Sequence, residues 1–138
     1  MDMVAGLIKR NGKLLLIHNT KYGLRIEPPG GKKHPEESWK QAVIREIEEE
    51  LGIRVQVKKF FGAYHTLSPE GEFDVRMYWC TILEGEPRTQ EPEKSAGHNW
   101  YSFEEMEQLM ELVPNMQMAL PKLKHHLTPR KWFSRFRK

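Results

Sequence analysis

The chain has 138 residues, of which 38% are hydrophobic and 30% charged, a composition that is typical of one globular domain and excludes a disordered chain. No apolar run approaches the roughly 20 residues that a membrane helix needs, and the N-terminus lacks the basic and apolar segments of a secretory signal. The single cysteine, Cys80, excludes an intrachain disulfide and a cysteine-rich zinc site, and we expect it to be a core residue. These features together predict a cytoplasmic protein.

The formal net charge of +3 is distributed unevenly along the chain. Seven of the 22 basic residues fall between Lys122 and Lys138 without an acid, which leaves 15 basic and all 19 acidic residues in the first 121 positions. We therefore predict a domain over residues 1–127 and a basic, aromatic tail over residues 128–138. The tail either docks its aromatic side chains on the domain, which we favour, or binds RNA or an anionic membrane surface.

The first third of the chain contains a predicted hairpin and a loop. Residues 3–9 and 13–18 are predicted strands, and Asn11-Gly12 between them favours a tight turn because both residues tolerate positive φ. Residues 22–26 are predicted as a short strand that leads into a turn or loop at residues 28–31, Pro-Pro-Gly-Gly.

A capped helix follows this loop. Ser38 is the expected N-cap, the helix runs to about Leu51, and Gly52 ends it. The later predicted elements are strands over residues 53–64, 73–83 and 100–102, a turn at 68–71, a polar loop over 85–97, and helices over 103–110 and 115–126, the last kinked or divided at Pro121. Strands on both sides of a central helix, with more helix at the C-terminal end, predict an α/β protein with a mixed sheet between helices.

The predicted helix over residues 39–51 carries three carboxylates on one arc. At about 100° per residue, Glu46, Glu49 and Glu50 share a face, Glu48 points elsewhere, and the apolar residues of the helix form the neighbouring arc. Like charges at this spacing weaken a helix, but a hard cation such as Mg²⁺ between them makes the arrangement favourable. The competing interpretation is a solvated acidic helix face.

The spacing around this helix favours the metal site. Gly31 is followed by five residues and Glu37, and then by seven residues and the run Arg-Glu-Ile-Glu-Glu-Glu-Leu-Gly-Ile at residues 45–53. This pattern resembles the Nudix box, G-x5-E-x7-R-E-U-x-E-E-x-G-U with U aliphatic, at every specified position. The match covers residues 31–53. The resemblance to the Nudix (MutT-like) family implies an α/β/α sandwich with a mixed β-sheet. It also implies a hydrolase that acts on nucleoside diphosphates linked to another group, with Mg²⁺ or Mn²⁺ as cofactor.

The resemblance also implies roles for individual residues. Glu46, Glu49 and Glu50 would be the metal-binding carboxylates, Glu46 and Glu49 would therefore take part in catalysis, and the Gly30 carbonyl would be a further metal ligand. Arg45 would orient Glu46.

Other positions of the box would support the structure of this site. Glu37 would be the partner of Arg45, and Gly31 and Gly52 would shape the backbone on either side of the helix.

The base that activates water would be either Glu46 or a glutamate of a distant loop. Glu91 and Glu93 are the candidates for the second role, and we take Glu93 as the predicted catalytic residue; the alternative is an exposed polar loop. Arg25 and Glu27 precede the glycine loop, where a strand would point one of them toward the substrate. Arg25 is a weaker candidate for a contact with substrate phosphate, because a surface ion pair explains it better.

The favoured hypothesis is cleavage of a diphosphate linkage in a nucleoside triphosphate or related nucleotide. ADP-ribose and dinucleoside polyphosphates are alternative substrates, and a non-catalytic nucleotide- or RNA-binding module is the alternative from another functional class. Because members of the family often form dimers, a homodimer is an additional expectation.

Overall fold

The computed structural model describes residues 1–127, and the predicted tail over residues 128–138 lies outside them. In chain order the elements are β1 (Asp2–Arg10), β2 (Lys13–Asn19), β3 (Arg25–Glu27), β4 (Gly30–Lys32), α1 (Trp39–Leu51), β5 (Arg54–Ser68), β6 (Gly71–Glu84), β7 (Ser95–Tyr101), α2 (Phe103–Glu107) and α3 (Pro114–Leu127). No helix within these residues is long and apolar enough to cross a membrane.

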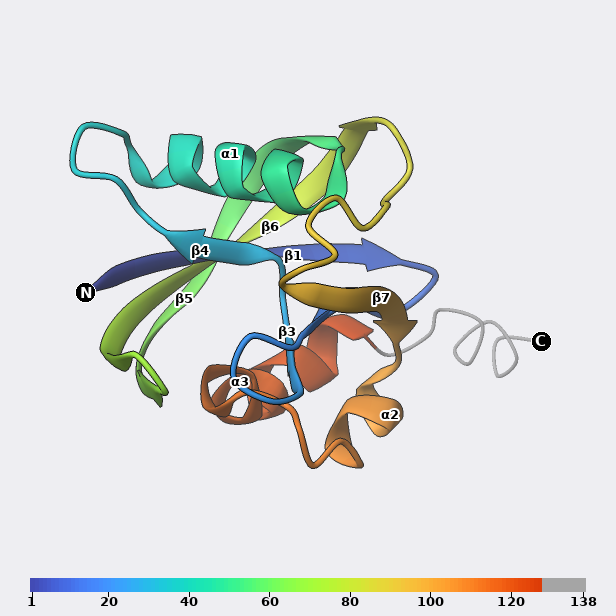
Figure 1. Ribbon diagram of the computed structural model, residues 1–138. Coiled ribbons are helices and arrows are strands. Elements are labelled where there is room, and N and C mark those ends of the chain that lie inside the picture. Colours follow the sequence, from blue (N-terminus) through green and yellow to red (C-terminus); the bar gives the residue numbers. More distant parts are fainter. Residues whose placement is uncertain (128–138) are drawn as a thin grey trace.

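The strands form a mixed sheet in which β1 is the central element. Its order is β3-β2-β1-β6-β5, with β4 also paired to β1 and β7 also paired to β2. The β1–β6 pair is parallel, whereas β1 is antiparallel to β2 and β4. Figure 1 shows α1 on one side of the strands and α2 and α3 on the other, so the predicted α/β/α sandwich with a mixed sheet is confirmed.

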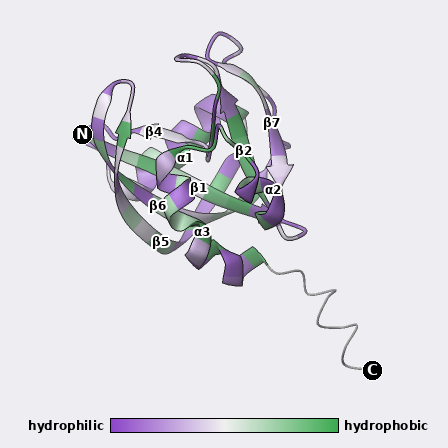
Figure 2. Cartoon of the chain, turned by 90° about the horizontal axis from the view of Figure 1, so that it is seen from below, coloured by the Kyte–Doolittle hydropathy of each residue, from purple (hydrophilic) through white to green (hydrophobic). Residues whose placement is uncertain are grey.

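The middle of the sheet is buried on both faces. In β2, Leu14 and Leu16 belong to the core that α3 covers, whereas Leu15 and Ile17 belong to the core that α1 covers. Successive side chains of a strand point to opposite faces, so a strand between two helical layers needs a continuous apolar run. In Figure 2 the central strands are largely hydrophobic, while α3 alternates between hydrophobic and hydrophilic segments, as expected of a helix with one buried face.

The predicted turn and helix ends are confirmed. Asn11 and Gly12 have φ values of 52° and 76°, which the tight β1–β2 hairpin requires. Ser38 and Gln41 form a reciprocal capping box at the start of α1, and Gly52, with φ 66°, ends the helix. Burial of one face of α1 against the sheet then sets the direction of its acidic face.

The prediction of a loop at residues 28–31 was wrong at its second half. Gly30 and Gly31 belong to β4, where they pair with Ala5 and Val4 of β1. A Cβ on Gly30 would lie only 2.0 Å from the Val4 carbonyl oxygen, so the close approach of the two strands requires glycine. The prolines and glycines of this segment predict a turn. The strand pairing is not visible in the local sequence because the partner residues lie about 25 positions earlier in the chain.

Several predicted boundaries also differ from the structure. The third strand begins at Arg25, α2 ends at Glu107, and β7 begins at Ser95, inside the predicted polar loop. Pro121 lies within α3 and does not divide it. Buried residues on both sides of the proline hold α3 on the sheet, and this packing offsets the backbone hydrogen bond that the proline cannot donate. These residues are Met116, Ala119, Leu123 and Leu127.

Candidate functional site

A cleft of about 470 Å³ opens between α1, the strands β3 and β4, and the tip of the β5–β6 hairpin. Its volume falls within the range of roughly 300–1,000 Å³ that is typical of small-molecule sites. Glu46, Glu49 and Glu50 line it from α1, and Gly30 and Gly31 line it from β4. The structure therefore brings the central residues of the predicted site into one cavity.

The acidic face of α1 is graded from exposed to buried. The side chain of Glu49 is 51% exposed, whereas that of Glu46 is 16% exposed. Glu50 accepts a hydrogen bond from the Gly30 amide at 2.7 Å. Burial raises the pKa of Glu50 well above its usual value, and the nearby carboxylates of Glu27, Glu46 and Glu91 raise it further. Burial also raises the pKa of Glu46.

Arg45 connects the helix to the preceding loop. Its guanidinium donates two hydrogen bonds to Glu37, at 2.7 and 3.0 Å, and one to the Lys32 carbonyl oxygen at 3.0 Å. The same group donates to Glu46 at 3.0 Å and to Glu49 at 3.3 Å. The two-point contact with Arg45 lowers the pKa of Glu37 to about 2. Arg45 is thus held by Glu37 and in turn orients the carboxylates of α1.

The two glycines of β4 differ in what lies next to them. A Cβ on Gly31 would come within 2.5 Å of Glu46 Oε2, so the Glu46 carboxylate occupies the space that a side chain would fill. At Gly30, the space is filled by the backbone of β1. Gly52 lies at the other end of α1, where its amide donates to the Glu48 carbonyl oxygen. Gly31 thus lies beside the Glu46 carboxylate, and Gly52 ends the helix that carries it.

The loop between β6 and β7 supplies a further carboxylate, and it is Glu91. The Arg88 and Gln90 amides donate to the carbonyl oxygens of Leu51 and Glu50 at the C-terminal end of α1. These bonds satisfy carbonyl groups that the helix leaves free, and they bring Glu91 to the cleft. Glu93, the predicted catalytic residue, is exposed and does not line the cleft.

Two further carboxylates, Glu27 and Glu70, lie on the opposite wall of the cleft. Glu27 lines the cleft with a pKa that burial raises, and it accepts a hydrogen bond from Asn19 at 2.6 Å. Glu70, at the hairpin tip, accepts contacts from Lys21, Tyr22 and Lys32. The sequence of residues 68–71 predicts only a turn, and it contains no local signal for the contacts of Glu70 with residues of other strands and loops.

Arg25 also lines the cleft, half-buried at the start of β3. It therefore lies where the sequence-based hypothesis of a substrate contact needs it.

The side chains fit a hard divalent cation by their chemistry. The cleft gathers carboxylate oxygens, the ligands that Mg²⁺ and Mn²⁺ prefer, and it partly buries three of the carboxylates, those of Glu27, Glu46 and Glu50, at a cost that a cation would relieve. Within residues 1–127, however, no three acidic, histidine or cysteine side chains already converge on one point. Glu50 accepts the Gly30 amide through Oε1, and Glu46 accepts Arg45 through Oε1.

Comparison with known proteins is consistent with this geometry. A CTP pyrophosphohydrolase of Escherichia coli (strain K12) is 40% identical over 67 residues, 46% of this chain and 50% of that protein. An ADP-ribose pyrophosphatase of Methanocaldococcus jannaschii is 31% identical over 97 residues, 67% of this chain and 57% of that protein. The chain thus spans about half the length of these curated relatives.

The fold has close counterparts among solved structures. The crystal structure of a MutT NUDIX hydrolase from Burkholderia pseudomallei superposes with a TM-score of 0.79 at 27% identity, covering 87% of this chain and 95% of that one. A family model described as the NUDIX domain matches residues 2–123, which include every residue that lines the cleft. The chain therefore belongs to the NUDIX family.

Proposed function

We propose that this protein is a metal-dependent hydrolase that cleaves a diphosphate linkage in a nucleoside triphosphate or a related nucleotide. The observation that carries the proposal is the convergence, in one cleft, of the α1 carboxylates and Glu91 beside a backbone without side chains at Gly30 and Gly31. A hard cation among these carboxylates would relieve their mutual repulsion and the cost of their burial.

Glu46, Glu49 and Glu50 are the residues that would hold Mg²⁺ or Mn²⁺, and the Gly30 carbonyl oxygen would be a further ligand. When bound, the cation supplies charge neutralisation for the diphosphate and activation of the attacking water. Arg45 positions Glu46 and Glu49 through the hydrogen bonds described above, and Glu37 fixes Arg45.

A carboxylate must also accept the proton of the attacking water. Glu46 and Glu91 both line the cleft, and the charge of Glu91 is close enough to Glu46 to raise the pKa of Glu46. Glu91 is the loop residue that we now favour for this role, in place of Glu93. A Glu91→Gln variant with unchanged kcat assigns the proton transfer to Glu46.

The substrate class is a separate part of the proposal. The similarity to a CTP pyrophosphohydrolase favours a nucleoside triphosphate, with release of a monophosphate and pyrophosphate. The similarity to an ADP-ribose pyrophosphatase keeps ADP-ribose as the second candidate. Both substrates contain the linkage that the proposed site is suited to cleave.

The test is a turnover assay with nucleoside triphosphates, oxidised nucleoside triphosphates, ADP-ribose, dinucleoside polyphosphates and 5′-triphosphorylated RNA, with and without Mg²⁺. Glu49→Gln should lower kcat by about 100-fold or more, because a metal-binding carboxylate is lost. Glu48→Gln is the matched control, since Glu48 is the adjacent, exposed residue and does not line the cleft. Absence of turnover on every substrate, or equal activity of the two variants, would contradict the proposed function.

A further inference from the structure

The carboxylate of Glu70 is held by three donors from other elements. Its Oε1 accepts from Lys21 Nζ at 3.1 Å and from the Tyr22 hydroxyl at 3.0 Å, and its Oε2 lies 2.7 Å from Lys32 Nζ. Lys21 and Tyr22 belong to the loop between β2 and β3, and Lys32 ends β4. The tip of the β5–β6 hairpin is therefore attached to the opposite wall of the cleft through one side chain.

This donor set matches the chemistry of a phosphate group. Two ammonium groups and a hydroxyl converge on a single anion, and phosphate oxygens accept charge-assisted hydrogen bonds from the same donors. The surrounding lysines and tyrosine lower the pKa of Glu70 to about 2, so the carboxylate is an anion at every pH near neutrality. The donors therefore form an anion-binding position, and the Glu70 carboxylate is the anion that they bind.

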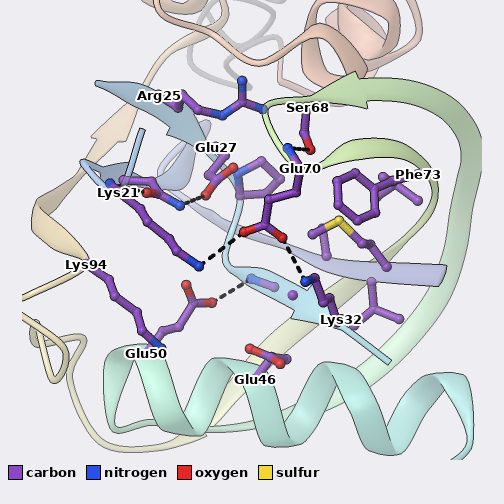
Figure 3. Close-up of a pocket in the computed structure, with 18 of the residues that line it drawn as sticks. Lys21, Arg25, Glu27, Lys32, Glu46, Glu50, Ser68, Glu70, Phe73 and Lys94 are labelled. Carbon is purple, nitrogen blue, oxygen red and sulfur yellow. Dashed lines mark hydrogen bonds and ion pairs between the residues drawn. The ribbon is translucent and has the colours of Figure 1, made fainter. Parts of the chain in front are cut away.

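The position faces the proposed catalytic residues. Figure 3 shows the Glu70 carboxylate pointing from the hairpin into the cleft, with Lys21 and Lys32 on its two sides and Glu46 and Glu50 beyond them. All five side chains line the same cavity of about 470 Å³. A polyphosphate chain that reaches the α1 carboxylates at one end would therefore meet the lysines at another.

We propose that Lys21, Lys32 and the Tyr22 hydroxyl form a binding subsite for a phosphate of the substrate, and that Glu70 occupies this subsite until the substrate displaces it. The inference rests on the proposed function in one respect, because it takes a polyphosphate-containing nucleotide as the ligand. In this proposal Glu70 competes with the substrate phosphate, because Glu70 must leave Lys21 and Lys32 before the phosphate can bind them.

Because the donors are partly exposed, replacing Glu70 by a phosphate should cost little free energy. The side chains of Lys21 and Lys32 are half exposed and that of Glu70 is 23% exposed, so water and salt reach the lysine ends of these ion pairs and weaken them. A phosphate with more negative charge than a carboxylate, held at the same time by a cation on α1, is the stronger partner for both lysines.

The experiment measures equilibrium binding of inorganic tripolyphosphate by isothermal titration calorimetry, in Mg²⁺ and in its absence. Glu70→Gln removes the competing charge while it keeps a carbonyl oxygen for the three donors, so the hairpin can stay in place. Glu72→Gln is the matched control, because it makes the same charge change on the same hairpin at an exposed residue that does not line the cleft.

A double variant, Lys21→Met with Lys32→Met, tests the donors themselves. Its control is Lys58→Met with Lys59→Met, which removes two exposed charges of β5 that do not line the cleft. We expect Glu70→Gln to bind tripolyphosphate about threefold to fivefold more tightly than wild type, and the double variant of Lys21 and Lys32 to bind about tenfold more weakly. Both control variants should differ from wild type by less than about twofold.

Two results would overturn the proposal. One is an affinity of Glu70→Gln that is equal to or below that of Glu72→Gln; together with a lowered Tm, this result assigns Glu70 to holding the hairpin alone. The other is an equal affinity of the two double lysine variants. Because the readout is binding and not turnover, a chain that hydrolyses nothing but shows the expected affinities retains the subsite and loses only the proposed function.

Discussion

Adding one methyl group to either glycine of β4 should have opposite consequences at the two positions. At Gly30 a Cβ would lie 2.0 Å from the Val4 carbonyl oxygen and 2.7 Å from Ala5 Cα. Ordinary contact begins at 3.4 Å, so β4 and β1 would have to separate by about 1.4 Å. At Gly31 the obstacle is instead the end of the Glu46 side chain, which can rotate away.

The two costs differ in size. Forcing the strands apart at Gly30 strains the packing by about 1–3 kcal/mol and weakens one or two backbone hydrogen bonds worth about 1 kcal/mol each. A total of about 3 kcal/mol lowers the Tm of a domain of this size by roughly 10 °C. Moving the Glu46 carboxylate off its preferred rotamer costs only about 1 kcal/mol, and the Gly→Ala change returns part of it through the unfolded chain.

The catalytic consequence is reversed. Displacing a catalytic group by about 1 Å costs roughly 100-fold in rate, so Gly31→Ala should keep its Tm within about 4 °C of wild type and lose about two orders of magnitude in kcat. The measurements are thermal unfolding by circular dichroism and kcat on the best substrate of the panel. Equal losses of Tm in the two variants, or a Gly31→Ala protein with full kcat, would refute the reasoning.

Three further predictions concern stability and reactivity. The pKa of Glu37 falls from 4.5 to about 2 on folding, so its contribution to stability is complete above pH 4.5 and is lost as the pH falls through 2. The Tm difference between wild type and Glu37→Gln should therefore be largest near pH 7 and shrink steadily across that window; a constant difference would contradict the ion pair. Ser38→Ala removes the N-cap of α1 and should lower the free energy of unfolding by about 1 kcal/mol in a urea titration, with no loss if the cap is irrelevant. Cys80 is buried with its pKa raised to about 12 by desolvation, so iodoacetamide at pH 8 should label it only in urea, and rapid labelling of the native chain would place the thiol at the surface.

Features that depend on neighbouring residues could be predicted from the sequence. The β1–β2 turn follows from the backbone preferences of Asn11 and Gly12, and the ends of α1 follow from Ser38 and Gly52. The acidic arc of α1 follows from helical periodicity, because the rotation per residue is a property of the helix itself. The box spacing indicates the family without reference to any tertiary contact.

Features that depend on distant residues required the tertiary structure. Gly30 and Gly31 form a strand only because β1 lies beside them, and Glu91 reaches the cleft because the amides before it bind the end of α1. The contact of Glu70 with Lys21 and Lys32 joins residues 49 and 38 positions apart in the chain. Local propensity determines whether a segment forms a turn or a helix, but it does not determine which distant segment packs against that turn or helix. The sequence by itself therefore determined the helix, its caps and its acidic face, whereas the packing of loops and hairpins decided which further charges enter the cleft.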